Sequence, residues 1–206
     1  GPPRSTLFPY TTLFRSIVLG FEGRAYGARD FYASQVLSTL LGGGMSSRLF
    51  QEARENRGLC YSIYAFHWGF SDTGVFGVHA ATEESDVPKL VPVILDELKK
   101  VTERIDEEEL QRARAQIHAG LMMSQESPAA RAGQIARQFL LFGRPIGNAE
   151  LMERLNALTT TRLQDLAGRL FIEGSPTVSA LGPVDNVPGP SEISQHLGGS
   201  FSHAAE

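Results

Sequence analysis

The sequence predicts an α+β domain, with a mainly antiparallel sheet that carries its helices on one face. The apolar patterns run in the order strand, helix, short helix, two strands, several helices and a last strand. Residues 59–68 and 75–81 are joined by a short turn of glycine, serine and aspartate, which is typical of an antiparallel hairpin. Strands and helices do not alternate along the chain, so a doubly wound parallel sheet is not expected.

Each element follows from its local pattern. Short apolar runs bounded by glycine or turn residues predict strands, and apolar residues three and four apart predict helices. Asp106 to Glu109 has the spacing of a capping box, which predicts the start of a long helix. The expected strands are 17–21, 59–68, 75–81 and 177–181; the expected helices are 28–41, a short one after Ser46, three that begin near Ser85, Asp106 and Ser127, and two short ones at 148–158 and 159–170.

The strand at 59–68 is apolar at both odd and even positions. A strand of this kind is usually covered on both of its faces. We therefore expect it in the centre of the sheet.

Composition excludes several classes of function. The 206 residues are 42% hydrophobic and carry a net charge of −4, with no basic stripe that would bind nucleic acid. No apolar run is long enough for a membrane span. The single cysteine, Cys60, is compatible with a reducing compartment, so we expect a cytoplasmic location, with a periplasmic one as the alternative.

The two ends of the chain differ from its middle. Residues 6–16, TLFPYTTLFRS, resemble the in-frame translation of a sequencing-adapter oligonucleotide, so we expect residues 1–16 to be an artefact outside the domain. A disordered leader is the alternative. Glycine, serine and proline dominate residues 185–206, which we expect to form a flexible tail. The domain itself then covers residues 17–184.

The most informative stretch runs from Leu41 to Ser62 and reads as helix end, glycine loop, short helix, glycine stop and strand. It places Arg54 on the last turn of the short helix and Tyr61 seven residues later, near the start of a strand. A tight corner of this kind can direct both side chains into one space. The residues alone favour a structural interpretation, with Arg54 as a solvated cation at a helix end and Tyr61 as an ordinary strand aromatic.

The segment LGGGMSSRLFQEARENRGLCYSI resembles the signature of the C-terminal half of the M16 zinc metallopeptidases, the insulinase, pitrilysin and mitochondrial processing peptidase family. The resemblance extends from about Ile17 to about Val184. It implies the two-layer α/β roll of an M16 half-domain. It also implies a partner, a homologous zinc-bearing N-terminal half or subunit, and a peptide as the substrate.

The resemblance implies roles for Arg54 and Tyr61 as catalytic residues that reach a zinc site in the other half. Tyr61 would donate a hydrogen bond to the substrate oxyanion, and Arg54 would hold the substrate backbone or carboxylate. Gly42, Gly43 and Gly44 correspond to a longer family loop implicated in substrate handling, with a plain tight turn as the equal alternative. Arg48 is either a second chamber cation or an ion-pair partner of Glu52.

No zinc ligand is expected in this chain. It lacks the His-x-x-Glu-His pattern of the family, and no two of its five histidines are three or four residues apart. His67 and His79 have the same parity on two strands of one hairpin, but two histidines without a third ligand are a weak metal site. We expect Cys60 to be a small core residue, and the acidic run at 107–109 to be a solvated helix start.

We therefore expect the C-terminal half of an M16 zinc metalloendopeptidase, inactive on its own, with zinc bound only by the partner half. The first alternative is a natural separate subunit that supplies the Arg/Tyr pair to a zinc-bearing chain. The second is a non-catalytic scaffold like the core subunits of respiratory complex III.

Overall fold

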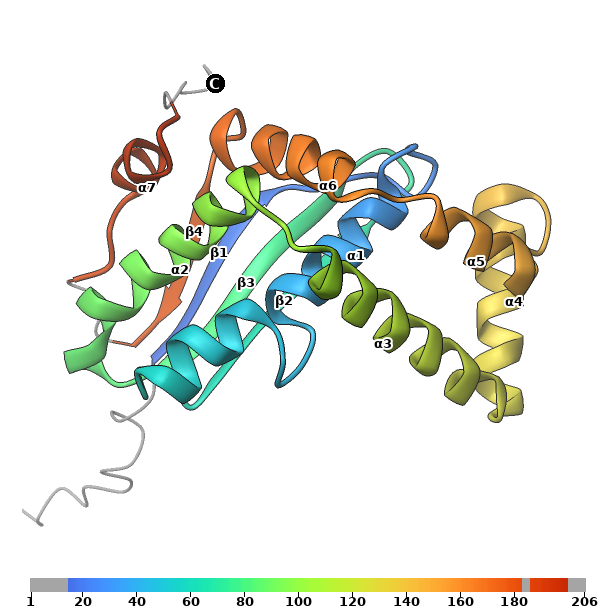
Figure 1. Cartoon of the computed structure of the whole chain (residues 1–206), viewed down its shortest axis with the longest axis horizontal. Coiled ribbons are helices and arrows are strands. Elements are labelled where there is room, and N and C mark those ends of the chain that lie inside the picture. The colour runs from blue at the N-terminus through green and yellow to red at the C-terminus, as the bar shows by residue number, and fades with distance from the viewer. Residues whose placement is uncertain (1–14, 183–185, 200–206) are drawn as a thin grey trace, which may run out of the picture.

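The computed structural model describes residues 15–182 and 186–199, which form two layers (Figure 1). One layer is a four-stranded antiparallel sheet in the order β2-β3-β1-β4, and helices α1, α2 and α6 lie across one of its faces. The predicted α+β class, with helices on one face of the sheet, is confirmed. The strands are β1 (Arg15–Glu22), β2 (Ser62–Gly69), β3 (Gly74–Thr82) and β4 (Thr177–Leu181).

The helices follow the predicted order, and each starts or stops where the local chemistry favours it. The capping box at Asp106 and Glu109 forms as expected, and Ser127 caps the next helix by accepting a bond from the Ala130 N–H. There are two π-helical segments: η2 precedes β2, and η4 follows α6. The helical elements are α1 (Phe31–Gly42), η2 (Phe50–Asn56), η3 (Glu84–Asp86), α2 (Val87–Glu103), α3 (Glu107–Gln125), α4 (Pro128–Phe142), α5 (Asn148–Asn156), α6 (Thr160–Ala167), η4 (Gly168–Ile172) and α7 (Pro190–Leu197).

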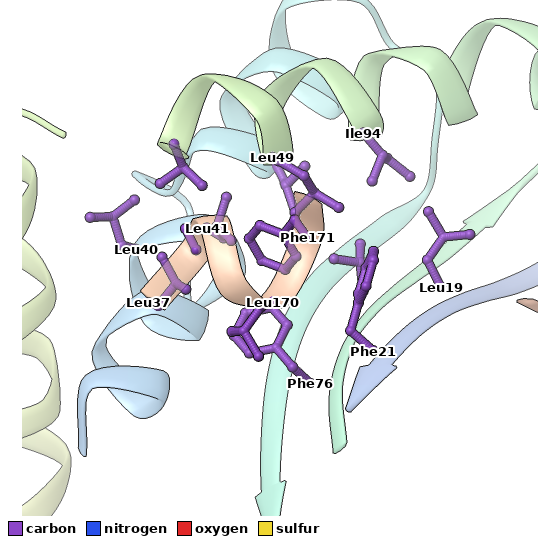
Figure 2. Packing of buried hydrophobic residues seen from close by; sticks show 14 of the residues in the cluster. Leu19, Phe21, Leu37, Leu40, Leu41, Leu49, Phe76, Ile94, Leu170 and Phe171 are labelled. Atoms are coloured by element: carbon purple, nitrogen blue, oxygen red, sulfur yellow. The ribbon is translucent and has the colours of Figure 1, made fainter. Parts of the chain in front are cut away.

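The core lies between the sheet and the helices. Side chains of β1 alternate, so Ile17, Leu19 and Phe21 are buried against the helices while their neighbours face the opposite side. Phe171 of η4 packs edge-on against Phe21 and Phe76, with ring centroids 5.1 and 5.3 Å apart (Figure 2). Burial of one such ring contributes about 2–3 kcal/mol, so this aromatic cluster fixes η4 on the sheet.

Strand β2 is at the edge of the sheet, so the prediction of a central strand is wrong. Its register pairs it with β3, and Ile63 on the helix side is buried. On the other face Tyr64 and Trp68 are exposed, and the rings of Phe66 and Trp68 lie 4.4 Å apart. The apolar residues at both parities therefore have two different environments: a covered face, and an open face on which aromatic side chains pack against one another.

The limits of the domain also differ from the expected ones. Strand β1 begins at Arg15, and Ser16 pairs with both Ala81 and Leu181, so the domain starts before residue 17. The rest of the segment expected to be an artefact, residues 1–14, lies outside the described residues.

The C-terminal segment is not uniformly loose. Within the stretch predicted to be a flexible tail, residues 190–197 form α7, whose Ile193 and Leu197 are fully buried, and the helix lies against α2 (Figure 1). Proline at the first turn and Gly198 in the left-handed region at φ 87° give this short helix a clear start and stop. Two apolar residues four apart bind it to the core despite the polar composition around them.

Candidate functional site

The glycine loop lets α1 end directly against the edge strand. A Cβ on Gly42 would lie 2.2 Å from the backbone nitrogen of Ala65, so only glycine fits there without moving α1 or β2. Gly43 continues the helix at φ −81° and donates its N–H to the Thr39 carbonyl at 2.8 Å. Neither Gly43 nor Gly44 has a positive φ. The loop therefore serves close packing between a helix end and a strand.

Arg48 holds the loop to the start of α3. Its Nε and Nη2 donate to the two carboxylate oxygens of Glu109, each at 2.7 Å, and Nη2 also donates to the Arg104 carbonyl at 2.7 Å. Burial alone would raise the pKa of Glu109, but the hydrogen bonds from Arg48 and the Asp106 N–H hold it below its ordinary value.

The structure corrects one alternative for Arg48. Glu52 is paired with Arg57 at 2.6 Å and with Asn56 at 3.1 Å, so the proposed Arg48–Glu52 ion pair is wrong. The substrate-binding role of Arg48 and of the glycines stays a prediction.

Arg54 stands on the solvent side of η2. Ala53, the preceding residue, is fully buried, whereas the Arg54 side chain is exposed and its guanidinium lies 4.6 Å from the centre of the Phe50 ring. No carboxylate of the described residues lies within 4.0 Å of this guanidinium. Arg54 is thus a cation held in place by an aromatic ring, with its hydrogen-bond donors directed to solvent.

The turn after η2 returns the chain to the sheet. Gly58 adopts φ 63°, and its N–H and that of Leu59 donate to the carbonyls of Arg54 and Ala53 at 3.0 and 2.9 Å. Leu59 and Cys60 then turn into the core, as expected for Cys60. Tyr61 follows as an exposed residue immediately before β2.

The phenol of Tyr61 donates a hydrogen bond to the carboxylate of Glu83, which follows the last residue of β3. This bond, and to a smaller extent burial and the charges of Glu83 and Asp86, raise the pKa of Tyr61 above its ordinary value. The phenol is therefore a protonated donor at neutral pH. Sequence reasoning missed Glu83, because residues 22 apart become neighbours only through the β2–β3 register; the hairpin pattern was the one available signal.

Arg54 and Tyr61 flank one turn, and both are exposed: Arg54 lies over the Phe50 ring, and Tyr61 is bonded to Glu83. Cys60 lies between them in the sequence, and the pKa of its thiol is raised by burial, an effect that the charge of Arg54 partly offsets. The corner thus presents a guanidinium and a phenol to solvent beside a buried, unreactive thiol.

The described residues do not form a metal site. They contain no group of three or more His, Cys, Asp and Glu side chains placed to hold an ion. His67 faces the helices, whereas His79 stacks on Tyr64 on the open face, so their equal parity in the sequence does not bring them together. The register pairs residue 64 with 79 and 67 with 76, which reverses the parity between the two strands.

His67 has a structural role. Its Nε2 accepts a hydrogen bond from the backbone N–H of Arg24 at 3.0 Å, and the Gln35 side-chain Nε2 lies 3.3 Å from its Nδ1. Burial lowers the pKa of His67 to about 4, which keeps the ring neutral at physiological pH.

No helix in the described part of the chain combines the length and the apolarity that a membrane crossing requires.

Comparison with known proteins identifies relatives for most of the chain. Residues 12–117 match the model of the peptidase M16 inactive domain. An uncharacterized zinc protease of Rickettsia bellii is 36% identical over 169 residues, which are 82% of this chain and 41% of that protein. A probable mitochondrial-processing peptidase subunit beta of Arabidopsis thaliana is 31% identical over 179 residues, 82% of this chain and 34% of that protein. The chain therefore spans about two fifths of the length of the curated relatives that it matches.

A solved structure has the same fold. A chain of complex III2 from Candida albicans, determined with Inz-5 bound, superposes with a TM-score of 0.83 at 20% sequence identity. The match covers 91% of this chain and 47% of that chain. At this level of identity the likeness shows the architecture alone.

Proposed function

Because this chain belongs to the peptidase M16 family, we propose that it is the C-terminal, zinc-free half of a zinc metalloendopeptidase. In this role it completes a substrate chamber and supplies Arg54 and Tyr61 to a zinc site that a homologous N-terminal half or subunit carries. The observation that carries the proposal is the corner between η2 and β2, where a guanidinium and a phenol both face solvent.

Tyr61 is suited to stabilise negative charge on a substrate oxygen. Its pKa is raised by the hydrogen bond to Glu83, so the hydroxyl stays protonated and can donate. A donor directed at the oxygen that gains charge in the transition state contributes about 3 kcal/mol in comparable sites. Tyr61 should therefore affect turnover more than substrate affinity.

Arg54 is suited to hold the substrate. Its guanidinium lies over the Phe50 ring. The nearby carboxylate of Glu52 forms its ion pair with Arg57 and not with Arg54. A planar cation with solvent-facing donors pairs well with a carboxylate or with backbone carbonyls of a peptide. Arg54 should therefore contribute to affinity as well as to turnover.

The zinc ion belongs to the partner half in this proposal. The described residues of this chain offer no ligand set that fits zinc, and the family relatives named zinc proteases are more than twice as long as the matched segment. This chain is therefore expected to be inactive alone. Its own chemistry is limited to binding and hydrogen bonding at the corner.

Reconstitution tests the proposal. The chain is mixed with the separately expressed zinc-bearing N-terminal region from its own protein or a close relative, and cleavage of a pool of fluorogenic peptides is measured. We expect cleavage only in the mixture, and a loss of about 100-fold in kcat with Tyr61→Phe.

The control is Tyr64→Phe, which removes an exposed phenol from β2, the strand that follows Tyr61, without changing the corner. A mixture that binds zinc and stays inactive, or one in which Tyr61→Phe and Tyr64→Phe behave alike, contradicts the proposal and favours the scaffold.

A further inference from the structure

Glu83 is the residue at the corner that neither the motif nor the proposed function includes. It follows the last residue of β3 in an extended conformation, with φ −85° and ψ 159°, and its carboxylate accepts the hydrogen of the Tyr61 phenol. Both side chains are exposed, so their pairing is not enforced by burial.

The backbone around the pair is tied together at two further points. The Tyr61 N–H donates to the Ala81 carbonyl at 2.8 Å, and the hydroxyl of the fully buried Thr82 donates to the Leu59 carbonyl at 2.5 Å. These two bonds fix the Cα positions on both sides of the phenol. The remaining freedom of Tyr61 is rotation of its side chain, and the bond to Glu83 restricts that rotation.

We propose that Glu83 is a positioning residue that holds the Tyr61 phenol as a hydrogen-bond donor at the corner until a substrate oxygen replaces the carboxylate as acceptor. This inference rests on the proposed function of Tyr61. In the exchange the phenol keeps its proton and no covalent bond changes. One hydrogen bond, to the Glu83 carboxylate, breaks as another, to the substrate oxygen, forms.

The charges that face the phenol come from two neighbouring elements. Glu83 at the end of β3 and Asp86 in η3 both carry negative charge toward it, and Asp86 is itself paired with Lys89 at 3.2 Å. Both carboxylates oppose ionisation of the phenol. Removal of the Glu83 charge should therefore allow Tyr61 to ionise at a lower pH, while removal of the Asp86 charge should act in the same direction more weakly.

The first experiment needs no activity. Tyrosine ionisation is followed by ultraviolet absorbance in the chain, and the Tyr61 component is obtained by subtracting the Tyr61→Phe titration. With Glu83→Gln this component should move to lower pH. The matched control is Glu126→Gln, an exposed acid that follows the last residue of α3, and it should leave the component nearly unchanged.

The second experiment uses the reconstituted peptidase. Glu83→Ala should lower kcat about 10-fold with little change in KM, since small displacements of a catalytic group cost up to about 100-fold. Glu83→Gln keeps an acceptor oxygen and should restore most of kcat, but the alkaline limb of its pH–rate profile should move to lower pH.

The outcomes separate the two proposals. If Tyr61→Phe leaves the rate unchanged, the proposed function fails, whatever Glu83 does. If Tyr61→Phe lowers the rate but Glu83→Gln changes neither the titration nor the pH profile, the positioning role of Glu83 is wrong while the proposed function stands.

Discussion

Arg48 and Glu109 form a bidentate ion pair that joins the segment between the glycine loop and η2 to the start of α3. Two hydrogen bonds of 2.7 Å connect them across 61 residues, and their side chains are only 14% and 16% exposed. Glu109 also closes the capping box by accepting the Asp106 N–H at 3.0 Å. One carboxylate therefore serves a helix start and a tertiary contact at the same time.

Loss of Arg48 should be costly. Arg48→Met leaves the Glu109 carboxylate largely buried without its main partner, and we expect a loss of about 2–4 kcal/mol in the free energy of unfolding, measured by denaturant titration. Arg112→Met is the control, because its pair with Glu108 is exposed and should contribute less than about 1 kcal/mol. Equal losses for the two variants would show that the burial of the Arg48 pair has no energetic effect.

Gly42 should be intolerant of any side chain. Gly42→Ala places a methyl group 2.2 Å from the Ala65 nitrogen, so α1 and β2 must separate, and we expect a loss of about 1–3 kcal/mol by thermal or denaturant unfolding. Gly44→Ala is the matched control, since its new methyl meets only the movable end of Gln116 at 3.1 Å. A loss for Gly44→Ala as large as for Gly42→Ala would contradict the close-packing role of Gly42.

The stability of the domain should fall as the pH drops below 6.5, in part because of His67. Its pKa is about 4 in the folded chain and 6.5 ordinarily, so the unfolded chain binds the proton more readily. The stability contributed by the neutral ring is complete above pH 6.5 and is lost progressively toward pH 4. By pH 5 the loss should be about 2 kcal/mol.

His67→Gln tests this origin. The amide keeps an acceptor for the Arg24 N–H but does not titrate, so the variant should lose less stability than the parent between pH 7 and pH 5. Burial also lowers the pKa of His79, which contributes equally to both chains and cancels in the comparison. Parallel pH profiles would assign the whole effect to other groups.

The contribution of Arg54 to kcat/KM should differ from that of the nearby Arg57. In the reconstituted peptidase, Arg54→Ala should lower kcat/KM by about 10–100-fold, because charge-assisted bonds to the substrate are lost. Arg57→Ala removes a cation three residues away that is already paired with Glu52, and should change kcat/KM less than about threefold. Similar losses would indicate a general effect of positive charge at this surface.

The last helix should contribute to stability. Ile193→Ala removes a fully buried side chain of α7 and should cost about 2–4 kcal/mol in chemical unfolding, whereas Gln195→Ala, on the exposed side of the same helix, should change little. A negligible effect of Ile193→Ala would mean that α7 is not packed on α2 in solution.

The corner itself was predictable. The glycine run, the Gly58 stop and the spacing of Arg54 and Tyr61 are local features, and local features are set by residues within a few positions of one another. The positive φ of Gly58 follows from this local pattern. The capping box at Asp106 and Glu109 was predictable from the sequence for the same reason. The exposure of Tyr61 was not, because the sequence placed it in a strand expected to be covered on both faces.

Long-range partners were not predictable. Glu109 for Arg48, Glu83 for Tyr61 and Arg24 for His67 lie 61, 22 and 43 residues away, and one chain carries no signal that selects them. The edge position of β2 also depends on which strands pair. Its aromatic residues are compatible with a central strand and with an edge strand that has one uncovered face.

The amino-acid sequence by itself determined the α+β class, the order of the elements, the glycine-stopped turn between Arg54 and Tyr61, and the family. Only the tertiary structure decided that β2 is an edge strand, that His67 and His79 face opposite sides, that α7 belongs to the core and that Tyr61 bonds Glu83. The physical reason is that periodicity, caps and turns act over a few residues, whereas register and side-chain pairing depend on how distant segments share one buried volume.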